Sequence, residues 1–305
     1  MNDVAVILAG FVAATVRIST PLLLAATGEL VAERAGVINL GVEGAMLAGA
    51  LASAMGAATA GPWAGVLAAV GAGLLVAACF SAVAIAARAD QIITGTAITL
   101  GTIGLTGAIY RSAFGAAGPG LSIPTFAALP VPGLRQIPLL GPALFEQSAL
   151  TYLGWILVPL ASWFLFRSWW GLALRASGES AEAARANGVP VRRLQILATL
   201  CGGALAGLGG ATLVLAQVGT FAEKMTAGRG FIAIAIVVLG RWHPRGVLAA
   251  ALLFGAASAL QFALQAMGLS APYQLFLGLP YLIALLALAG AVGKGRARAP
   301  AGLGR

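Results

Sequence analysis

The polar side chains that could do chemistry in this chain lie inside long apolar stretches. Glu43 follows Asn39 by four residues, so a helix would place both on one face. A carboxylate at mid-membrane costs about 2.5–3.5 kcal/mol on insertion scales, so Glu43 must face protein or water. Two interpretations stay open: Glu43 lines a path for a polar solute, or it accepts hydrogen bonds from backbone near a broken helix.

Further polar residues recur at helical spacing in two other apolar stretches. Thr99, Thr102 and Thr106 would share one helical face, and Gln261 and Gln265 would share another. Thr99, Thr102, Gln261 and Gln265 join the first two residues as candidates for a translocation path. Each has a structural alternative, because threonines bond back to helix carbonyls and buried amides need partners on neighbouring helices.

Residues for catalysis or metal binding are scarce. His243 is the only histidine, and Cys79 and Cys201 stand singly in apolar segments. The only lysines are Lys224 and Lys294, and neither follows a glycine-rich phosphate loop, so the chain is not expected to hydrolyse ATP itself. We therefore predict no enzyme activity, no catalytic residue, no metal and no cofactor.

The composition is that of a membrane protein. Of 305 residues, 60% are hydrophobic and only 9% are charged, against about 25% in soluble domains. The basic residues behind the net charge of +9 lie in loops between apolar spans. The tendency of basic loops to stay on the cytoplasmic side of a membrane explains them better than nucleic-acid binding does. Gly203 and Gly207 have the spacing that brings membrane helices into close contact.

The apolar stretches predict an all-α, polytopic helical membrane protein with about nine crossings, eight or ten being alternatives. The expected spans are 4–32, 36–59, 63–87, 92–113, 149–166, 194–218, a short segment 230–239 that begins earlier or is broken, 246–267 and 275–292. Residues 1–293 form one transmembrane domain, and 294–305 form a basic, frayed cytoplasmic tail. Residues 115–148 are expected to be an external loop with a re-entrant piece.

Orientation follows from the basic residues, which mark cytoplasmic loops. If residues 173–190 are cytoplasmic, far more basic residues lie inside than outside. The inside set is Arg34, Arg88, Arg167, Arg175, Arg185, Arg192, Arg193, Arg241, Arg245, Lys294, Arg296, Arg298 and Arg305, and the outside set is Arg111, Arg135, Lys224 and Arg229.

A short polar helix is expected within 173–190, at about 177–188. Ser177 can cap its start, and Gly188 can end it in a left-handed conformation before Pro190. The helix is too short and too charged to cross a membrane, so a partner outside the bilayer is expected to dock on it.

These residues also carry a resemblance. Glu182-Ala183-Ala184, followed after three residues by Gly188, resembles the EAA-type loop of the membrane subunits of ABC importers. In that family the loop forms the coupling helix, which seats in the ATPase subunit. The resemblance implies ATPase-coupling roles for Glu179, Glu182, Ala183, Arg185 and Gly188. The match is partial, because the family's later Ile-x-Leu-Pro is replaced by the sequence at 196–199, and an ordinary surface helix remains the alternative.

Five longer stretches are similar to one branch of these permeases, which serves branched-chain amino acids, simple sugars and nucleosides. They are Glu33–Gly44, Asp90–Ala97, Met225–Ile232, Gly240–Trp242 and Pro280–Leu282. They look most like the nucleoside permeases associated with basic-membrane-protein-type binding lipoproteins. The resemblance implies an ABC ATPase, a second permease subunit that pairs with this one as a heterodimer, and an external substrate-binding lipoprotein.

The resulting prediction is a permease subunit of an ATP-driven importer in the bacterial inner membrane, carrying nucleosides, with purine nucleosides favoured, or simple sugars. The sequence leaves the substrate, the permease pairing and a substrate site of its own open. An ion-coupled secondary transporter of a small polar solute, with Glu43 titrating, is the alternative. An intramembrane enzyme would need a catalytic set that the sequence does not offer.

Overall fold

The computed structural model describes residues 3–115, 123–134, 137, 140–266, 278, 282–283, 285–286, 289 and 299–304. The long helices are α1 (Asp3–Arg34), α2 (Val42–Ala60), α3 (Pro62–Phe80), α4 (Gln91–Phe114), α6 (Ala149–Arg167), α9 (Val191–Leu213) and α11 (Pro244–Ala266). The shorter helices are α5 (Leu140–Phe145), α7 (Trp169–Glu179), α8 (Ala181–Ala186) and α10 (Arg229–Leu239). Two π-helical turns, η1 (Ser81–Ala86) and η3 (Val214–Val218), extend α3 and α9.

The fold is that of a polytopic helical membrane protein. Seven helices of the described residues are long and apolar enough to cross a membrane, and α10 is shorter. Most of the last predicted span, 275–292, and half of the basic tail lie outside the described residues. The prediction of about nine crossings therefore stays a prediction.

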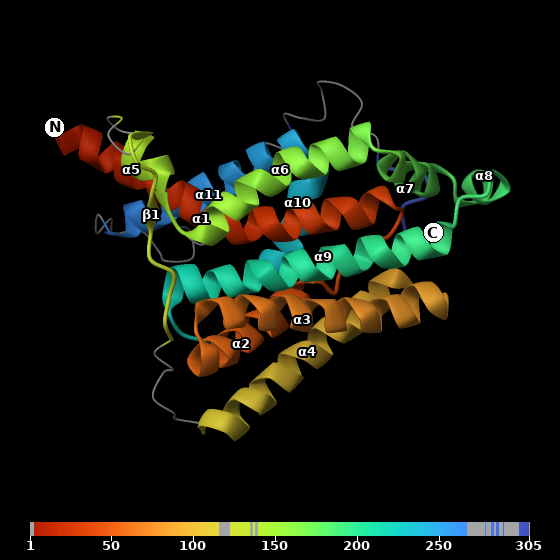
Figure 1. The fold of residues 1–305 in the computed structure, drawn as a ribbon, viewed down its shortest axis with the longest axis horizontal. Coiled ribbons are helices and arrows are strands. Elements are labelled where there is room, and N and C mark those ends of the chain that lie inside the picture. The colour runs from red at the N-terminus through yellow and green to blue at the C-terminus, as the bar shows by residue number, and fades with distance from the viewer. Residues whose placement is uncertain are drawn as a thin grey trace.

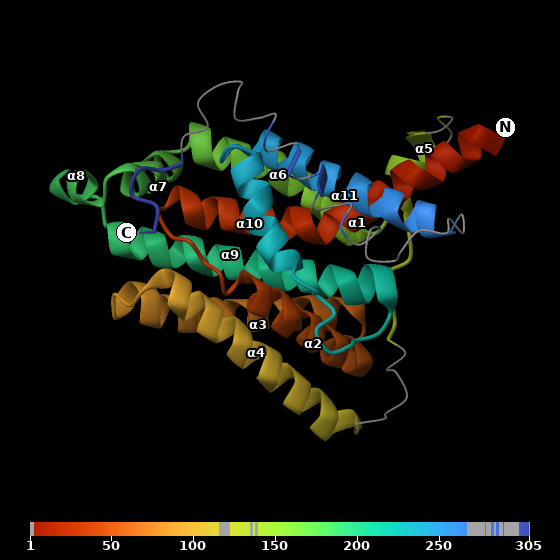
Figure 2. The same cartoon turned by 180° about the vertical axis from the view of Figure 1, so that it is seen from behind.

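The helices form layers around α9, which runs the length of the molecule (Figure 1). α1, α6 and α11 lie on one side of α9, and α2, α3 and α4 lie on the other. α10 crosses this direction and links the two sides (Figure 2). α7, α8 and the C-terminus gather at one end of the molecule, and the N-terminus, α5 and the strand β1 (Leu129–Pro130) gather at the other.

Glycines let α9 approach α3 and α2 closely. A Cβ on Gly203 would lie 2.5 Å from the carbonyl oxygen of Gly73 in α3, and one on Gly207 would lie 2.3 Å from that of Ala69. A Cβ on Gly210 would lie 2.8 Å from the backbone nitrogen of Ala50 in α2. The predicted close contact through Gly203 and Gly207 is confirmed. Lipid provides no hydrophobic drive between helices, so such backbone contact is what holds this bundle together.

Of the first two expected spans, one matches the observed helix and the other does not. The first expected span is one continuous helix, α1, with Pro21 inside it. The second does not begin at Gly36: residues 36–41 are not helical, and α2 starts at Val42. Gly36 has a φ of +90°, a left-handed conformation that ends α1 and turns the chain. Asn39 therefore does not share a helical face with Glu43, and Glu43 lies in the first turn of α2.

The expected external loop contains little regular structure in its described part. β1 pairs antiparallel with β2 (Glu146–Gln147), and α5 precedes β2. Backbone hydrogen bonds from Ile123 to Gly219 and from Phe126 to Leu215 tie this segment to the end of α9 and η3. Arg135, which was placed outside the membrane, lies outside the described residues.

Candidate functional site

The connection between α1 and α2 is irregular backbone enclosed by the bundle, and we name residues 35–41 the helix break. Irregular backbone at membrane depth must find its hydrogen-bond partners within the protein. Glu29 of α1 accepts from the backbone N–H of Asn39 at 2.9 Å, and Gln91 of α4 accepts from that of Ile38 at 2.8 Å. The side chain of Asn39 accepts from the N–H of Gly41 at 2.9 Å, which is an Asx-type turn. Side chains from two helices thus fix the break.

Glu43 holds the start of α10. Its Oε1 accepts from the hydroxyl of Thr226 at 2.6 Å and from the N–H of Gly228 at 2.9 Å. Its Oε2 accepts from the N–H of Gly230 at 2.6 Å. The first N–H groups of a helix have no partner within the helix, and a negative charge there also meets the positive end of the dipole. A Cβ on Gly230 would lie 2.5 Å from the Cα of Glu43, so only glycine allows this approach. Both carboxylate oxygens therefore accept hydrogen bonds at the start of α10, which agrees with the interpretation of Glu43 as an acceptor for backbone near a broken helix.

The end of α1 is tied to the turn between α10 and α11. The indole N–H of Trp242 donates to Glu33, and Arg34 donates through Nε to the carbonyl oxygen of Trp242 at 2.8 Å. Arg241 and Trp242 both have positive φ, of 55° and 51°, which is strained for residues with side chains. These bonds to α1 oppose that strain. The second carboxylate oxygens of Glu29 and Glu33 are buried without a hydrogen-bond partner among the described residues.

The threonine face of α4 packs against the break and α2. Thr99, Thr102 and Thr106 are all buried. The Thr99 hydroxyl donates to the carbonyl oxygen of Leu40 at 2.9 Å, and Thr106 donates back to the carbonyl oxygen of Thr102 at 2.7 Å. A Cβ on Gly44 would lie 3.1 Å from the Thr102 hydroxyl oxygen. The predicted common face exists, and it supports the break through Thr99.

The two glutamines of α11 lie away from the break. Gln261 is buried and Gln265 is half-buried. The Nε2 of Gln265 is buried without a hydrogen-bond partner among the described residues. Asn39, Glu43, Thr99 and Thr102 form one cluster, and the glutamines are a separate feature of the chain. The structure does not bring all six candidate path residues together.

The predicted polar helix is divided into two. α7 ends at Glu179 and α8 begins after Ser180, whose Oγ accepts from the N–H of Ala183 at 3.3 Å. Ser177 does not cap, because it lies inside α7 and donates to the carbonyl oxygen of Leu174 at 2.6 Å. Gly188, with a φ of +78°, ends α8 as predicted. We name residues 179–188 the elbow.

The elbow protrudes from the bundle at the end of the molecule that holds the C-terminus (Figures 1 and 2). Its polar candidates, Glu179, Glu182, Arg185 and Gly188, are exposed, as is Ala183, and only Ala184 is buried. A cavity of about 580 Å³ lies beside α8, with Arg88, Arg185 and Arg192 in its lining. Three of the basic residues expected inside therefore lie beside the elbow.

The end of the chain joins the elbow to the helix break. The N–H of Gly302 donates to the carbonyl oxygen of Gly178 at 2.9 Å, and that of Gly304 donates to Gly36 at 3.2 Å. The N–H of Ala301 donates to Glu179 at 3.3 Å. The described part of the tail, residues 299–304, is packed against the protein, so the expectation of a frayed tail is wrong for these residues.

The comparison with protein families settles the class of the chain. Residues 11–288 match the family described as branched-chain amino acid transport system / permease component. The chain belongs to this family. Four of the five resembling stretches of the permease meet at the helix break and its contacts with α4, α10 and Trp242.

Several relatives of the permease have names that state a substrate. One, from Haloferax volcanii, is provisionally named a glucose ABC transporter permease protein; it is 42% identical over 86% of this chain and 80% of its own length. The guanosine ABC transporter permease protein of Bacillus subtilis is 37% identical over 98% of this chain and 96% of its own. The nucleoside ABC transporter permease protein of Lactococcus lactis is 34% identical over 78% and 77%. No solved structure matches the permease.

Sequence reasoning missed two parts of this arrangement. Glu29 was not among the predicted site residues, whereas it accepts a hydrogen bond from the break. Trp242 stood in a resembling stretch without a role, and it is the anchor for Glu33 and Arg34. The signal available was the concentration of acids at the end of α1, since buried carboxylates need donors.

Proposed function

We propose that the permease carries nucleosides, purine nucleosides in particular, across the cell membrane as part of an ATP-driven importer. The observation that carries the ATP-driven mechanism is the exposed elbow, which lies at the arginine-rich end of a chain that belongs to a permease family. The guanosine permease relative aligns with nearly the whole chain, and a second relative is named for nucleosides. The relative with a glucose name keeps simple sugars as the other substrate class.

The elbow is proposed to be the ATPase-coupling element. Glu179, Glu182, Ala183, Arg185 and Gly188 present an exposed surface beyond the bundle. Glu179 is hydrogen-bonded to the terminal segment, which also reaches Gly36 at the helix break. A displacement of the elbow by an ATPase subunit would therefore act on the break through residues already in contact. Alternating access of the pathway then follows from ATP binding and hydrolysis in the partner.

The translocation path is proposed to pass beside the cluster of Asn39, Glu43, Thr99 and Thr102. Discontinuous helices often surround the substrate path of transporters, and both α2 and α10 begin inside the bundle here. Gln261 and Gln265 on α11 are a second candidate lining. Glu43 acts in this proposal by fixing α10, because both of its carboxylate oxygens already accept hydrogen bonds.

The proposed assembly contains partners that the chain does not supply. They are an ABC ATPase subunit that hydrolyses ATP, a second permease subunit in a heterodimer, and an external substrate-binding lipoprotein. The elbow and the tail lie on the cytoplasmic side of a bacterial inner membrane. The arginines beside the elbow support this orientation. The permease itself uses no cofactor and binds substrate weakly, since recognition resides in the external protein.

The substrate is tested by uptake of labelled inosine in cells with and without this gene, with unlabelled ribose as competitor. Gene-dependent uptake that ignores ribose is expected. Gene-dependent uptake that ribose blocks would show recognition of the sugar part. Absence of gene-dependent inosine uptake would overturn the nucleoside proposal and direct the same assay to glucose and other simple sugars.

A secondary transporter driven by an ion gradient is the alternative, since Glu43 is a buried acid. Both of its carboxylate oxygens accept hydrogen bonds from the start of α10 and the residues just before it, which favours a structural role for Glu43. The two mechanisms separate in the energy source. Uptake that survives ATP depletion and collapses with an uncoupler would favour the secondary transporter.

A further inference from the structure

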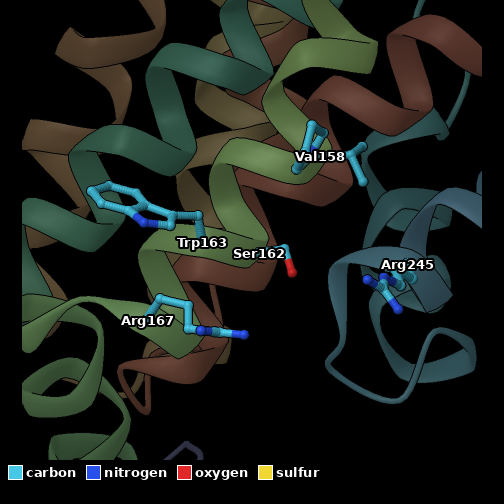
Figure 3. Close-up of a pocket in the computed structure, with 6 residues that line it drawn as sticks. Val158, Ser162, Trp163, Arg167 and Arg245 are labelled. Atoms are coloured by element: carbon cyan, nitrogen blue, oxygen red, sulfur yellow. The ribbon is translucent and has the colours of Figure 1, made fainter.

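A second cavity lies at the outer surface of the bundle, between α6 and α11 (Figure 3). Its volume is about 710 Å³. We name it the α6–α11 groove. Its lining residues are Val158, Pro159, Ser162, Trp163, Arg167 and Arg245.

The α6 wall of the groove changes from apolar to cationic along the helix. Val158 and Ser162 are four residues apart, as are Pro159, Trp163 and Arg167 in turn, so these residues form one stripe on α6. Val158 and Arg167 are nine residues apart, which is about 14 Å along a helix. The hydrocarbon core of a bilayer is about 30 Å thick, so this distance is close to the depth of one leaflet.

The polar end of the groove carries two positive charges from different helices. In Figure 3 the side chain of Arg167 extends from α6 toward the side where Arg245 of α11 lies, and the Ser162 hydroxyl points into the space between them. Both arginines are exposed. Among the described residues, the one salt bridge joins Arg111 and Glu223, so neither arginine of the groove has a carboxylate partner there.

The neighbouring histidine reports the same positive field. The pKa of His243 is lowered first by burial, and then by the positive charges of Arg245 and Arg34. Its Nδ1 accepts a hydrogen bond from the N–H of Arg245 at 3.2 Å, which the neutral ring allows. An anion between the two arginines of the groove would offset this charge, and guanidinium groups bind phosphate with paired hydrogen bonds.

We propose that the α6–α11 groove is a binding site for an anionic phospholipid. The phosphate lies between Arg167 and Arg245 near Ser162, and an acyl chain follows Val158 and Pro159 along α6. Basic pockets between membrane helices at the cytoplasmic surface suit such headgroups. A free phosphate would leave the apolar wall empty, and a neutral lipid would leave both charges uncompensated. Only the assignment to the cytoplasmic leaflet rests on the proposed function, through its orientation.

The test uses the purified full-length permease, in its transporter complex, with native mass spectrometry of the lipids that it retains. The probes are phosphatidylglycerol and phosphatidylcholine of equal chain length, offered together. Preferential retention of phosphatidylglycerol is expected. Because each charge near a membrane surface contributes about fivefold in affinity, the double variant R167Q/R245Q is expected to lose roughly thirty-fold. Arg193→Gln, an exposed arginine of α9 outside the groove, is the matched control and should retain the lipid.

Three results would overturn the proposal. Equal retention of the two lipids would remove the requirement for negative charge. Unchanged retention of phosphatidylglycerol in R167Q/R245Q would place the lipid elsewhere. Displacement of phosphatidylglycerol by inorganic phosphate at millimolar concentration would reduce the groove to a phosphate site without a lipid. None of these readouts depends on transport, so they are separable from a failure of the proposed function.

Discussion

The helix break and the elbow are both short interruptions of helix, and they treat their polar groups in opposite ways. At the break, Glu29, Gln91 and Thr99 reach from neighbouring helices to bond the backbone. At the elbow, Glu182 and Arg185 are exposed, and the local bonds are those of Ser180 and Gly188 within the same segment. The difference teaches that polar residues at the break maintain the fold, whereas polar residues at the elbow are available to a partner.

The largest effect is expected on transport, from changes at the elbow. Glu182→Lys reverses an exposed charge, and Gly188→Pro replaces a residue with a φ of +78° by one fixed near −65°. Both variants are expected to abolish uptake while membrane insertion and thermal stability stay close to the unmodified protein. Uptake by cells and thermal inactivation in detergent measure the two properties.

Glu146→Lys is the control for the charge reversal, since β2 lies with β1 at the other end of the molecule. It should leave uptake intact. Normal transport in either elbow variant would remove the elbow from the coupling proposal and weaken the comparison with the break.

The next effect is a loss of stability at the start of α10. Glu43→Ala would leave the Thr226 hydroxyl and the N–H groups of Gly228 and Gly230 without their acceptor. Unsatisfied buried groups cost about 1–3 kcal/mol each, so a loss of about 3 kcal/mol or more is expected. Glu43→Gln keeps one acceptor oxygen and should fall between. A Glu43→Gln protein with unchanged thermal stability and lost uptake would instead favour a role in the path.

A smaller effect is expected from close helix contact in α9. Gly203→Val would force side-chain atoms against Gly73 of α3, where even a Cβ is only 2.5 Å from the carbonyl oxygen. Overpacking of this kind costs about 1–3 kcal/mol, seen as a lower temperature of inactivation. Gly101→Val is the control, since nothing lies within 4 Å of a Cβ there. Equal loss of stability in both variants would show that the cost does not come from contact with α3.

The smallest effect is a pH dependence at His243. Burial and the neighbouring arginines lower the pKa of this histidine in the folded protein, whereas its pKa in the unfolded chain is about 6.5. The unfolded state therefore binds more protons as the pH falls through that value, and stability is lost on acidification. His243→Asn keeps an acceptor for the Arg245 N–H but does not titrate. Its stability is expected to fall less than that of the unmodified protein between pH 7.5 and 5.5, and identical curves would contradict the assignment.

Much of the fold was predictable because long apolar stretches in lipid have few alternatives to helix. The starts and ends of α4, α6 and α9 lie within a few residues of the expected spans. The start of α2 was not predictable, because residues 36–41 are as apolar as the membrane helix that follows them. Their non-helical backbone is stabilised by partners on α1 and α4 that are distant in the sequence. The end of the polar helix at Gly188 was predicted correctly, but its start was not, because Ser177 and Ser180 are equivalent caps in sequence and only the folded chain shows which of them caps.

The candidate site was predictable only in part, for the same reason. Spacing correctly grouped the threonines of α4, because they share one regular helix. It misplaced Asn39 relative to Glu43, because the chain between them is not helical. It gave no role to Trp242, whose contact with Glu33 joins residues 209 positions apart in the sequence.

The central claim is that the permease imports a nucleoside, and that the elbow couples this import to ATP hydrolysis by the partner subunit. The most direct test measures uptake of labelled inosine in cells that carry the unmodified gene, the Glu182→Lys gene or no gene, before and after depletion of ATP with the proton gradient maintained. We expect uptake only with the unmodified gene, and its loss when ATP is removed. Uptake that persists without ATP, or that the Glu182→Lys protein supports at the normal rate, would contradict the account.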